Sequence, residues 1–295
     1  DLVTFANGVL TDHGVDDRNR LDGIVTTGPG GALKNVEIGD DPASNVTTWQ
    51  DYLAPGNNRA FGYDGLHRLT SASSGLWGDL HYGYDALGNR TTEERDSDLT
   101  TYVYDGATNR LSELTGAVEG TFSYDDVGRV TEEVRGPPGL IFADGFESGT
   151  TGAWGSGASS GVLVYTFNAA DQLVQVEEGG QTLGVYAYDG DGLRVSATAE
   201  GATVYSLRHR AGDTRAEYDA GGELIAEYLY AGGRQLGKIV PDGLGGDEVS
   251  YFHPDHLGTA MLITNDAGAL TWHGEYEPFG EPVTSTGAPD RYRFT

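Results

Sequence analysis

The sequence predicts an all-β protein: one long antiparallel sheet of β-hairpins that pair edge to edge. Three observations support this prediction: a Tyr-Asp signature recurs about every 20 residues, Gly is abundant, and Tyr, Val and Thr, which favour strands, occur beside Gly, Asp and Asn, which favour turns. Forty-six Gly is about twice the usual share, yet 17 Tyr are also present. Because disordered Gly-rich chains lack aromatic residues, this Gly content indicates many tight turns.

The repeat has a regular spacing. The first four Tyr of the signature are 21, 20 and 20 residues apart, and Phe167 precedes Tyr188 by 21 residues. The signature residues are Tyr63, Asp64, Tyr84, Asp85, Gly88, Tyr104, Asp105, Tyr124, Asp125, Gly128, Tyr188 and Asp189. A regular period with one signature per unit is typical of a repeat protein.

Each unit has the pattern of strand, turn and strand. An aromatic residue two positions before the Tyr, as in Tyr82 and Tyr84, places two rings on one strand face. Asp or Asn followed by small residues and Gly favours a turn, and a second strand such as 90–94 follows. Since one hairpin cannot bury its apolar face alone, we expect successive hairpins to pair edge to edge. Tyr84, Tyr104 and Tyr124 should then occupy equivalent positions and stack on one face.

One signature is missing between Tyr124 and Phe167, which are 43 residues apart. The segment 136–161 contains Gly-Pro-Pro-Gly and a Gly/Ser/Ala stretch, so it is interpreted as a loop insertion. Phe146 and Trp154 could form a small aromatic binding patch, but attachment of the loop to the sheet is the more common use of such residues.

Charge and composition exclude several classes of protein. A formal charge of −27 disfavours binding to nucleic acid and to anionic lipid. The absence of Cys excludes disulfides, thiolate catalysis and Cys-ligated metals. No apolar run has the length of a membrane span, and no signal-peptide pattern follows Asp1, so a mature product or an excised piece is expected.

The C-terminal fifth carries a second motif. It comprises 251–260, 265–268, 274–281 and 291–295, with the motif residues Asp255, His256, Leu257, Gly258, Asp266, Gly268, Tyr276, Pro278, Phe279 and Gly280. Six periodic Tyr-Asp units followed by this segment resemble the YD repeats and repeat-associated core of bacterial Rhs proteins. Related repeats occur in the BC component of insecticidal toxin complexes and in teneurins. The resemblance covers roughly residues 20–295.

The resemblance implies a β-sheet that spirals into a hollow shell around a toxic C-terminal domain, with the core capping one end. In many members the core ends in a self-cleavage site built around aspartates. This chain stops at Thr295, before that motif, and is shorter than the family's complete shells. We therefore expect a C-terminal shell fragment, a partial barrel or a protomer that closes by assembly. The expected segments are 1–59 (degenerate β-repeats), 60–135 (YD repeats), 136–161 (loop insertion), 162–240 (YD repeats) and 241–295 (core).

The chemical motifs favour structure over catalysis. Five carboxylates crowd the core and could pair as acid and base, namely Asp255, Asp266, Glu275, Glu277 and Glu281. In the family, however, the cleavage aspartates lie nearer the missing end, so turn-forming and solubilising roles are expected. His253, Asp255 and His256 could suggest a metal site, but Pro254 between them favours packing. Asp189-Gly190-Asp191-Gly192 spaces its carboxylates like a calcium loop, yet lacks the remaining ligands and occupies a repeat turn.

Arg recurs after the Asp of several turns, at Arg68, Arg90, Arg110, Arg129 and Arg194. These residues could form a basic ladder for a ligand, but local pairing with carboxylates is the expected use. No catalytic residue, metal or cofactor is therefore predicted.

The favoured function is a non-catalytic β-shell or scaffold of an Rhs-type polymorphic toxin system, secreted or at the surface of a bacterium. Its partner would be a C-terminal toxin domain or other shell segments of a parent protein, and a homo-oligomer or filament is a further option. Alternatives are an adhesin or assembling structural protein that binds carbohydrate or protein, and a self-cleaving aspartyl protease core. A cargo domain encoded directly after Thr295 would favour the shell, whereas an anchor or stalk would favour the adhesin.

Overall fold

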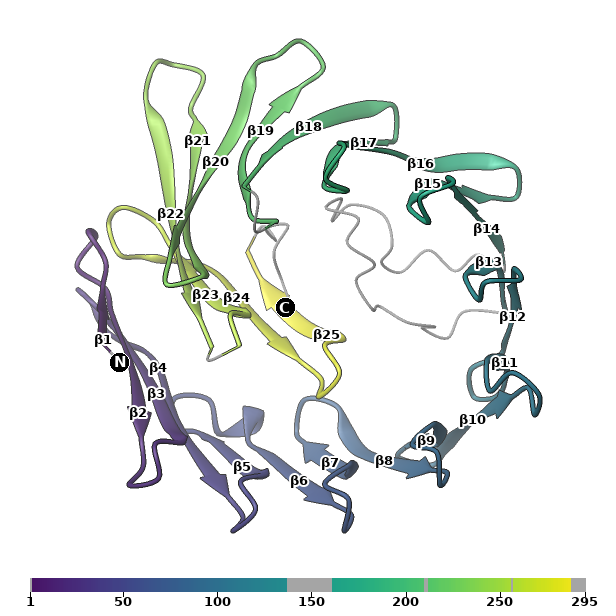
Figure 1. Ribbon diagram of the computed structural model, residues 1–295. Coiled ribbons are helices and arrows are strands. Elements are labelled where there is room, and N and C mark those ends of the chain that lie inside the picture. Colours follow the sequence, from purple (N-terminus) through teal and green to yellow (C-terminus); the bar gives the residue numbers. More distant parts are fainter. Residues whose placement is uncertain (1, 137–160, 210–211, 256, 288–295) are drawn as a thin grey trace. The chain divides into compact units, whose positions relative to one another are not determined.

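The computed structural model describes residues 2–136, 161–209, 212–255 and 257–287 (Figure 1). The described residues contain 25 strands, assigned to one antiparallel sheet, and a single helical turn, η1 (Pro55–Asn57), of the 3-10 type. Strands occupy more than half of residues 60–240. The predicted all-β fold built of antiparallel hairpins is confirmed.

The chain divides into two compact units. Unit 1 contains residues 1–97, 230–238 and 248–295, and unit 2 contains residues 98–229 and 239–247. The strands that lie wholly or almost wholly in unit 1 are β1 (Leu2–Thr4), β2 (Leu10–Val15), β3 (Leu21–Gly28), β4 (Gly31–Asp40), β5 (Val46–Asp51), β6 (Arg59–Tyr63), β7 (Leu69–Ser74), β8 (Gly78–Tyr84), β9 (Arg90–Arg95), β22 (Asp247–Pro254), β23 (Ala260–Thr264), β24 (Leu270–Tyr276) and β25 (Pro282–Thr286).

Unit 2 is built almost entirely of repeat hairpins. Its strands are β10 (Asp98–Tyr104), β11 (Leu111–Gly116), β12 (Gly120–Tyr124), β13 (Val130–Arg135), β14 (Val162–Phe167), β15 (Leu173–Glu178), β16 (Gln181–Tyr188), β17 (Arg194–Ala199), β18 (Ala202–Arg208) and β19 (Thr214–Asp219). β20 (Leu224–Ala231) and β21 (Arg234–Pro241) contain residues of both units. Small apolar clusters along the hairpins, such as Leu163, Val176, Tyr186 and Ala197, form the core of this unit.

A β-bulge ends the first strand of each repeat hairpin. The register shifts between Gly62 and Tyr63 and again between Gly83 and Tyr84, and the same shift precedes Tyr104, Tyr124 and Tyr188. A bulge adds one residue on one strand, which bends that strand and increases its twist. The Tyr-Asp signature therefore marks a repeated bend in the sheet as well as a turn.

The turns have the chemistry expected of an Asp–Gly signature. In the turn after β6, the Asp64 carboxylate accepts hydrogen bonds from the Leu66 and Arg68 amides at 2.9 and 3.0 Å. The Asp64 amide donates to the Arg68 carbonyl at 3.0 Å, which closes the loop. In the equivalent turns after β8 and β12, the fourth of the five turn residues is Gly88 or Gly128, with φ of 95° and 99° respectively. Only Gly adopts this conformation without steric cost, which explains its place in the repeat.

The core of unit 1 lies between its N-terminal hairpins and its C-terminal strands. β23 is buried along its whole length, which is unusual for a strand of a one-layer sheet. Met261 and Leu262 of β23 join a cluster with Ile24, Val36 and Trp49 of β3–β5. The strands β22–β24 therefore cover one face of the N-terminal hairpins within this unit.

The predicted insertion 136–161 lies, but for its two end residues, outside the described residues. The strands on either side of it are paired directly, because β13 and β14 share a register in which Glu133 faces Leu163. The Arg135 amide also donates to the Gly161 carbonyl at 3.0 Å.

Candidate functional site

The signature tyrosines of the repeat make the same contact in four hairpins. The hydroxyl of Tyr84 donates to the Leu69 carbonyl at 2.9 Å, and that of Tyr124 to the Leu111 carbonyl at 2.7 Å. Tyr63 and Tyr188 bond the carbonyls of Val46 and Leu173 in the same way. Each acceptor is the first residue of a strand in the preceding hairpin. The tyrosines therefore join consecutive repeats.

The signature arginines form a second link between repeats. Arg68 binds the Asp64 carboxylate of its own turn at 2.7 Å and donates to the Asp85 carbonyl of the next turn at 2.9 Å. Its guanidinium also lies 4.7 Å from the centre of the Tyr84 ring. The predicted pairing of these arginines with carboxylates is thus confirmed for Arg68.

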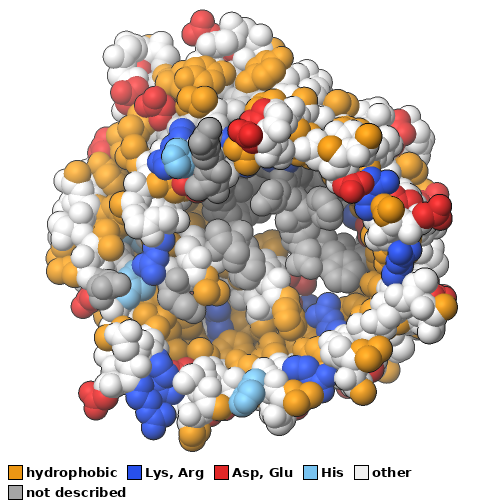
Figure 2. All heavy atoms as spheres, in the orientation of Figure 1, with side chains coloured by type: hydrophobic (Ala, Val, Ile, Leu, Met, Phe, Trp, Pro, Cys, Tyr) orange, Lys and Arg blue, Asp and Glu red, His pale blue; other side chains and the backbone are white. Residues whose placement is uncertain are grey.

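Arg129 repeats the pattern, with Asp125 at 2.5 Å and the Phe167 ring at 4.9 Å. Arg110 donates to the Asp125 carbonyl at 3.0 Å and lies 5.5 Å from the Tyr124 ring. On the face shown in Figure 2 the described Lys and Arg side chains are scattered rather than gathered in one patch. These arginines therefore stabilise the stacking of hairpins.

The residues of the C-terminal motif are divided among three turns. Asp255 begins the turn before β23, and its carboxylate accepts hydrogen bonds from the Leu257 and Thr259 amides, both at 2.9 Å. The Asp255 carbonyl accepts a further bond from the Gly258 amide at 3.3 Å. Asp266 lies in the turn after β23, together with Gly268, and accepts from the Tyr251 hydroxyl at 3.2 Å. These two turns lie at opposite ends of β23, so the structure does not bring Asp255 and Asp266 together.

The third turn contains Pro278, Phe279 and Gly280, and the Gly280 amide donates to the Glu277 carbonyl at 3.0 Å. Tyr276, just before it, is buried in a cluster with Phe252 and Trp272. His256 lies outside the described residues.

A buried charge cluster joins the N-terminal hairpins to the C-terminal motif. Lys34 of β4 lies 2.9 Å from the Asp51 carboxylate and 2.7 Å from the Glu275 carboxylate, with all three side chains at most 4% exposed. Arg59 of β6 bonds the other oxygen of Glu275, and His273 bonds the same oxygen as Lys34 at 2.9 Å. Two strands that are distant in sequence from β24 therefore supply the cations that neutralise Glu275.

Electrostatics hold Glu275 in its charged form. Burial alone would raise the pKa of this carboxyl, but the His273 hydrogen bond and the positive charges of Lys34 and Arg59 outweigh burial and lower it to about 2. Burial lowers the pKa of Arg59, against the attraction of Glu275. Since removing one partner of a buried ion pair leaves an uncompensated charge, this cluster strongly favours one docked arrangement of β24 on β4–β6.

His253 anchors the same strands through neutral hydrogen bonds. Its ring is fully buried and contacts the hydroxyls of Thr11 at 3.1 Å and Thr264 at 2.9 Å. Thr11 also pairs with Thr26 at 3.1 Å. Burial lowers the pKa of His253 to about 4, so the ring is neutral and donates one of its two hydrogen bonds while accepting the other. The predicted packing role of His253 agrees with these contacts.

The sequence interpretation missed Lys34, Asp51 and Arg59, which fall in the segment 1–59 described only as degenerate repeats. One signal was available: Lys34 is one of only two lysines, and it alternates with the apolar Val36 and Ile38. A lysine on the apolar face of a strand requires a buried carboxylate as partner.

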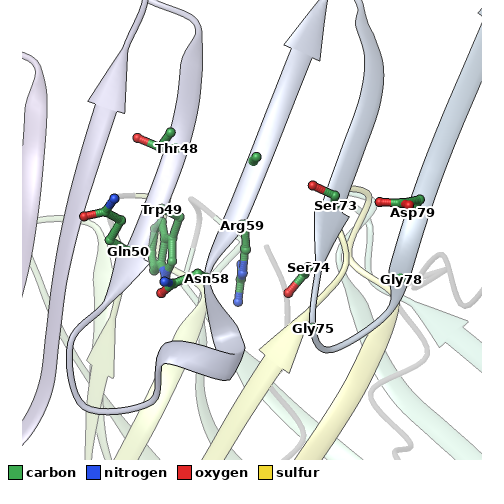
Figure 3. Close-up of a pocket in the computed structure, with 11 residues that line it drawn as sticks. Thr48, Trp49, Gln50, Asn58, Arg59, Ser73, Ser74, Gly75, Gly78 and Asp79 are labelled. Atoms are coloured by element: carbon green, nitrogen blue, oxygen red, sulfur yellow. The ribbon is translucent and has the colours of Figure 1, made fainter.

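A depression of about 450 Å³ lies over β5–β8 (Figure 3). Arg59 is one of the lining residues, with the guanidinium 5.1 Å from the Trp49 ring and 5.2 Å from the Trp77 ring. The lining holds a single carboxylate, Asp79, and no histidine, so it lacks an acid–base pair. In the described part of the chain no group of three or more His, Asp or Glu side chains could hold a metal ion. No helix among the described residues is long and apolar enough to span a membrane.

Known proteins resemble this chain both in its C-terminal motif and in its fold. The sequence profile of the family described as "RHS protein" matches residues 249–285, which include β23, β24 and all three turns of the C-terminal motif. The chain is therefore similar to RHS proteins over this segment. It is 25% identical over 223 residues to the tRNA3(Ser)-specific nuclease WapA of Bacillus spizizenii, and the alignment covers 73% of this chain and 8% of that protein.

Two further curated relatives are toxins. Double-stranded DNA deaminase toxin A of Burkholderia cenocepacia is 22% identical over 264 residues, covering 76% of this chain and 17% of the toxin. Toxin protein Tse5 of Pseudomonas aeruginosa is 23% identical over 310 residues, covering 78% of this chain and 23% of the toxin. The chain thus spans less than a quarter of the length of each of these three relatives.

Solved structures share the fold. The crystal structure of TcdB2-TccC3-Cdc42 matches 97% of this chain and 15% of its own chain, with a TM-score of 0.60 and 13% identity. The Photorhabdus luminescens Tc holotoxin pore matches the same shares, with a TM-score of 0.57 and 13% identity. The chain therefore has the fold of a segment of the Tc toxin shell.

Proposed function

We propose that this chain is a non-catalytic segment of a β-shell that encloses or presents a C-terminal toxin. The observation that carries the proposal is the docking of β22–β24 onto the N-terminal hairpins through Lys34, Glu275 and His253. This docking places the most buried polar groups of unit 1 in structural contacts. A wall that must exclude solvent and protease needs such a sealed seam, whereas a catalytic centre needs groups that reach a substrate.

Three of the five carboxylates that could have served as acid and base have structural partners. Asp255 closes a turn, Asp266 accepts from Tyr251, and Glu275 is neutralised in the buried cluster. We therefore assign the nuclease and deaminase activities in the relatives' names to parts of those proteins outside the aligned segment. A self-cleaving protease core has no supporting geometry in the described residues, and no contact among those residues favours the adhesin.

The partner proposed for the chain is a C-terminal toxin domain or further shell segments of a parent protein. The proposed location is outside a bacterial cell, either secreted or at the surface, because the bacterial relatives include toxins. The proposed core, 241–295, contains the profile match, and the other proposed segments keep the bounds given above. A homo-oligomer remains part of the proposal, and light scattering on the 295-residue chain tests it.

The function is tested with the chain extended by the residues that follow Thr295 in its parent gene. Limited proteolysis should leave that extension intact in the extended chain and digest it rapidly when it is expressed alone. Equal digestion of the two would contradict enclosure. As a matched control, the Lys34→Met substitution should expose the extension to protease, whereas Lys238→Met, which replaces the chain's only other lysine, should not.

A further inference from the structure

The turn between β24 and β25, the last that the structure describes, differs in charge from several signature turns of the repeat. In those turns the Asp is followed four residues later by Arg or Asn, and the two side chains bond, as in Asp64–Arg68 at 2.7 Å and Asp85–Asn89 at 2.8 Å. The turn between β24 and β25 has the same backbone closure, since the Glu277 amide donates to the Glu281 carbonyl at 2.8 Å. Its two equivalent positions are both occupied by carboxylates, which repel each other when both are charged.

The cation that this turn lacks comes from a different hairpin. Arg95, the last residue of β9, binds both oxygens of Glu277 at 2.6 and 2.9 Å. The same guanidinium lies 3.6 Å from Glu281 and 3.9 Å from Glu93. The side chain of Glu277 is 9% exposed and that of Glu281 is 27% exposed. One arginine therefore serves three carboxylates, and the bidentate bond commits it mainly to Glu277.

Apolar contacts hold the same turn against β8 and β9. The Phe279 ring lies 5.1 Å from the Tyr82 ring in an edge-on arrangement, and the Arg90 guanidinium lies 5.1 Å from Phe279. Val283 of β25 packs against the cluster that contains Leu80 and Tyr82. The docked turn thus combines an apolar anchor with an excess of negative charge.

We propose that residues 277–281 form a proton-dependent latch, which holds the β24–β25 hairpin on β8–β9 when the Glu277–Glu281 pair carries one proton and loosens when both are ionised. The charged groups facing Glu281 are Glu277 from its own turn and Glu93 and Arg95 from β9, and Arg90 pairs with Glu93 at 3.3 Å. The latch concerns only the docking of this hairpin, so it holds whether or not the chain encloses a cargo.

The titration of Glu281 supports this geometry. Burial first, and then the charge of Glu277, raises the pKa of this carboxyl from its ordinary 4.5 to about 7, against the attraction of Arg95. A carboxyl whose pKa is raised in the docked state contributes stability below its ordinary pKa and loses it as the pH rises through the raised value. The latch is therefore firm in mild acid and weak above neutrality.

Hydrogen exchange of residues 277–287 in the intact chain tests the latch. The protection factor, which corrects for the intrinsic pH dependence of exchange, should fall about tenfold from pH 6.0 to pH 8.5, given the raised and ordinary pKa values. The same ratio measured for buried β23 controls for a change in the whole unit. Equal protection of 277–287 at the two pH values would overturn the proposal.

Two substitutions separate the latch from general stability. Glu281→Gln, which keeps the shape and removes the charge, should make protection of 277–287 the same at both pH values. The control Glu227→Gln, at an exposed position of β20, should keep the tenfold fall. Arg95→Gln should lower protection further at pH 8.5, because Glu277 loses its cation. A Glu281→Gln variant that keeps the full pH dependence, or an Arg95→Gln variant with unchanged protection, would refute the latch.

Discussion

Replacing Lys34 by Met should destabilise unit 1 by about 3 kcal/mol. The substitution keeps the length of the side chain but leaves Asp51 and Glu275, 2% and 3% exposed, without their shared cation. Breaking a buried ion pair by removing one partner costs about 3–5 kcal/mol. Each carboxylate retains another partner, because the Leu53 and Ala54 amides donate to Asp51 and Arg59 binds Glu275. The loss should therefore fall at the lower end of that range.

Urea unfolding followed by tryptophan fluorescence measures this loss. Three of the four tryptophans, Trp49, Trp77 and Trp272, lie in the buried clusters of unit 1. Lys238→Met should cost less than about 1 kcal/mol, the scale for a half-buried charge near the surface. Combining Lys34→Met with Glu275→Gln should cost less than the sum of the single losses by about 1 kcal/mol or more, because the two side chains touch. A loss below about 1 kcal/mol for Lys34→Met would show that the charges are solvated and that the cluster does not specify the docking.

Three further predictions concern the repeat, the buried histidine and the insertion. Tyr124→Phe should lower the free energy of unfolding, measured by chemical denaturation, by about 1 kcal/mol, because it removes only the hydrogen bond to the Leu111 carbonyl. No measurable loss would show that this bond does not join the repeats. The His253 ring should titrate by NMR near pH 4. Because the pKa of His253 is lowered on folding, its contribution to the free energy of unfolding is complete above pH 6.5 and lost as the pH falls through 4. The measurement is made in a Glu281→Gln background, which removes the opposite pH dependence of that carboxyl. A titration midpoint of the ring near pH 6.5 would mean that the ring is hydrated. Deleting 139–160 should leave the protein soluble and rich in β-structure by circular dichroism, because the flanking strands β13 and β14 pair directly with each other. An insoluble deletion variant would show that the segment is an integral part of the sheet.

The sequence alone determined the repeating part of the structure. Strand, bulge, turn and strand are local events, set by Tyr, Asp and Gly within about ten residues of one another. Arg68, for example, pairs within its own turn and with the next turn. Such contacts recur at a fixed spacing, so the period that is visible in the sequence is also the period of the fold. The turns at Asp64, Asp85 and Asp125 could be anticipated for this reason.

Which distant hairpins meet depends on contacts between residues far apart in the sequence. Lys34 and Glu275 are 241 residues apart, and Arg95 and Glu277 are 182 residues apart, so no local pattern connects them. A lysine in a strand and a glutamate in a turn are ordinary in sequence, and they become specific only when burial removes water from around both charges. The local rules build the hairpins of unit 1, and the long-range desolvated pairs decide how its first and last hairpins dock.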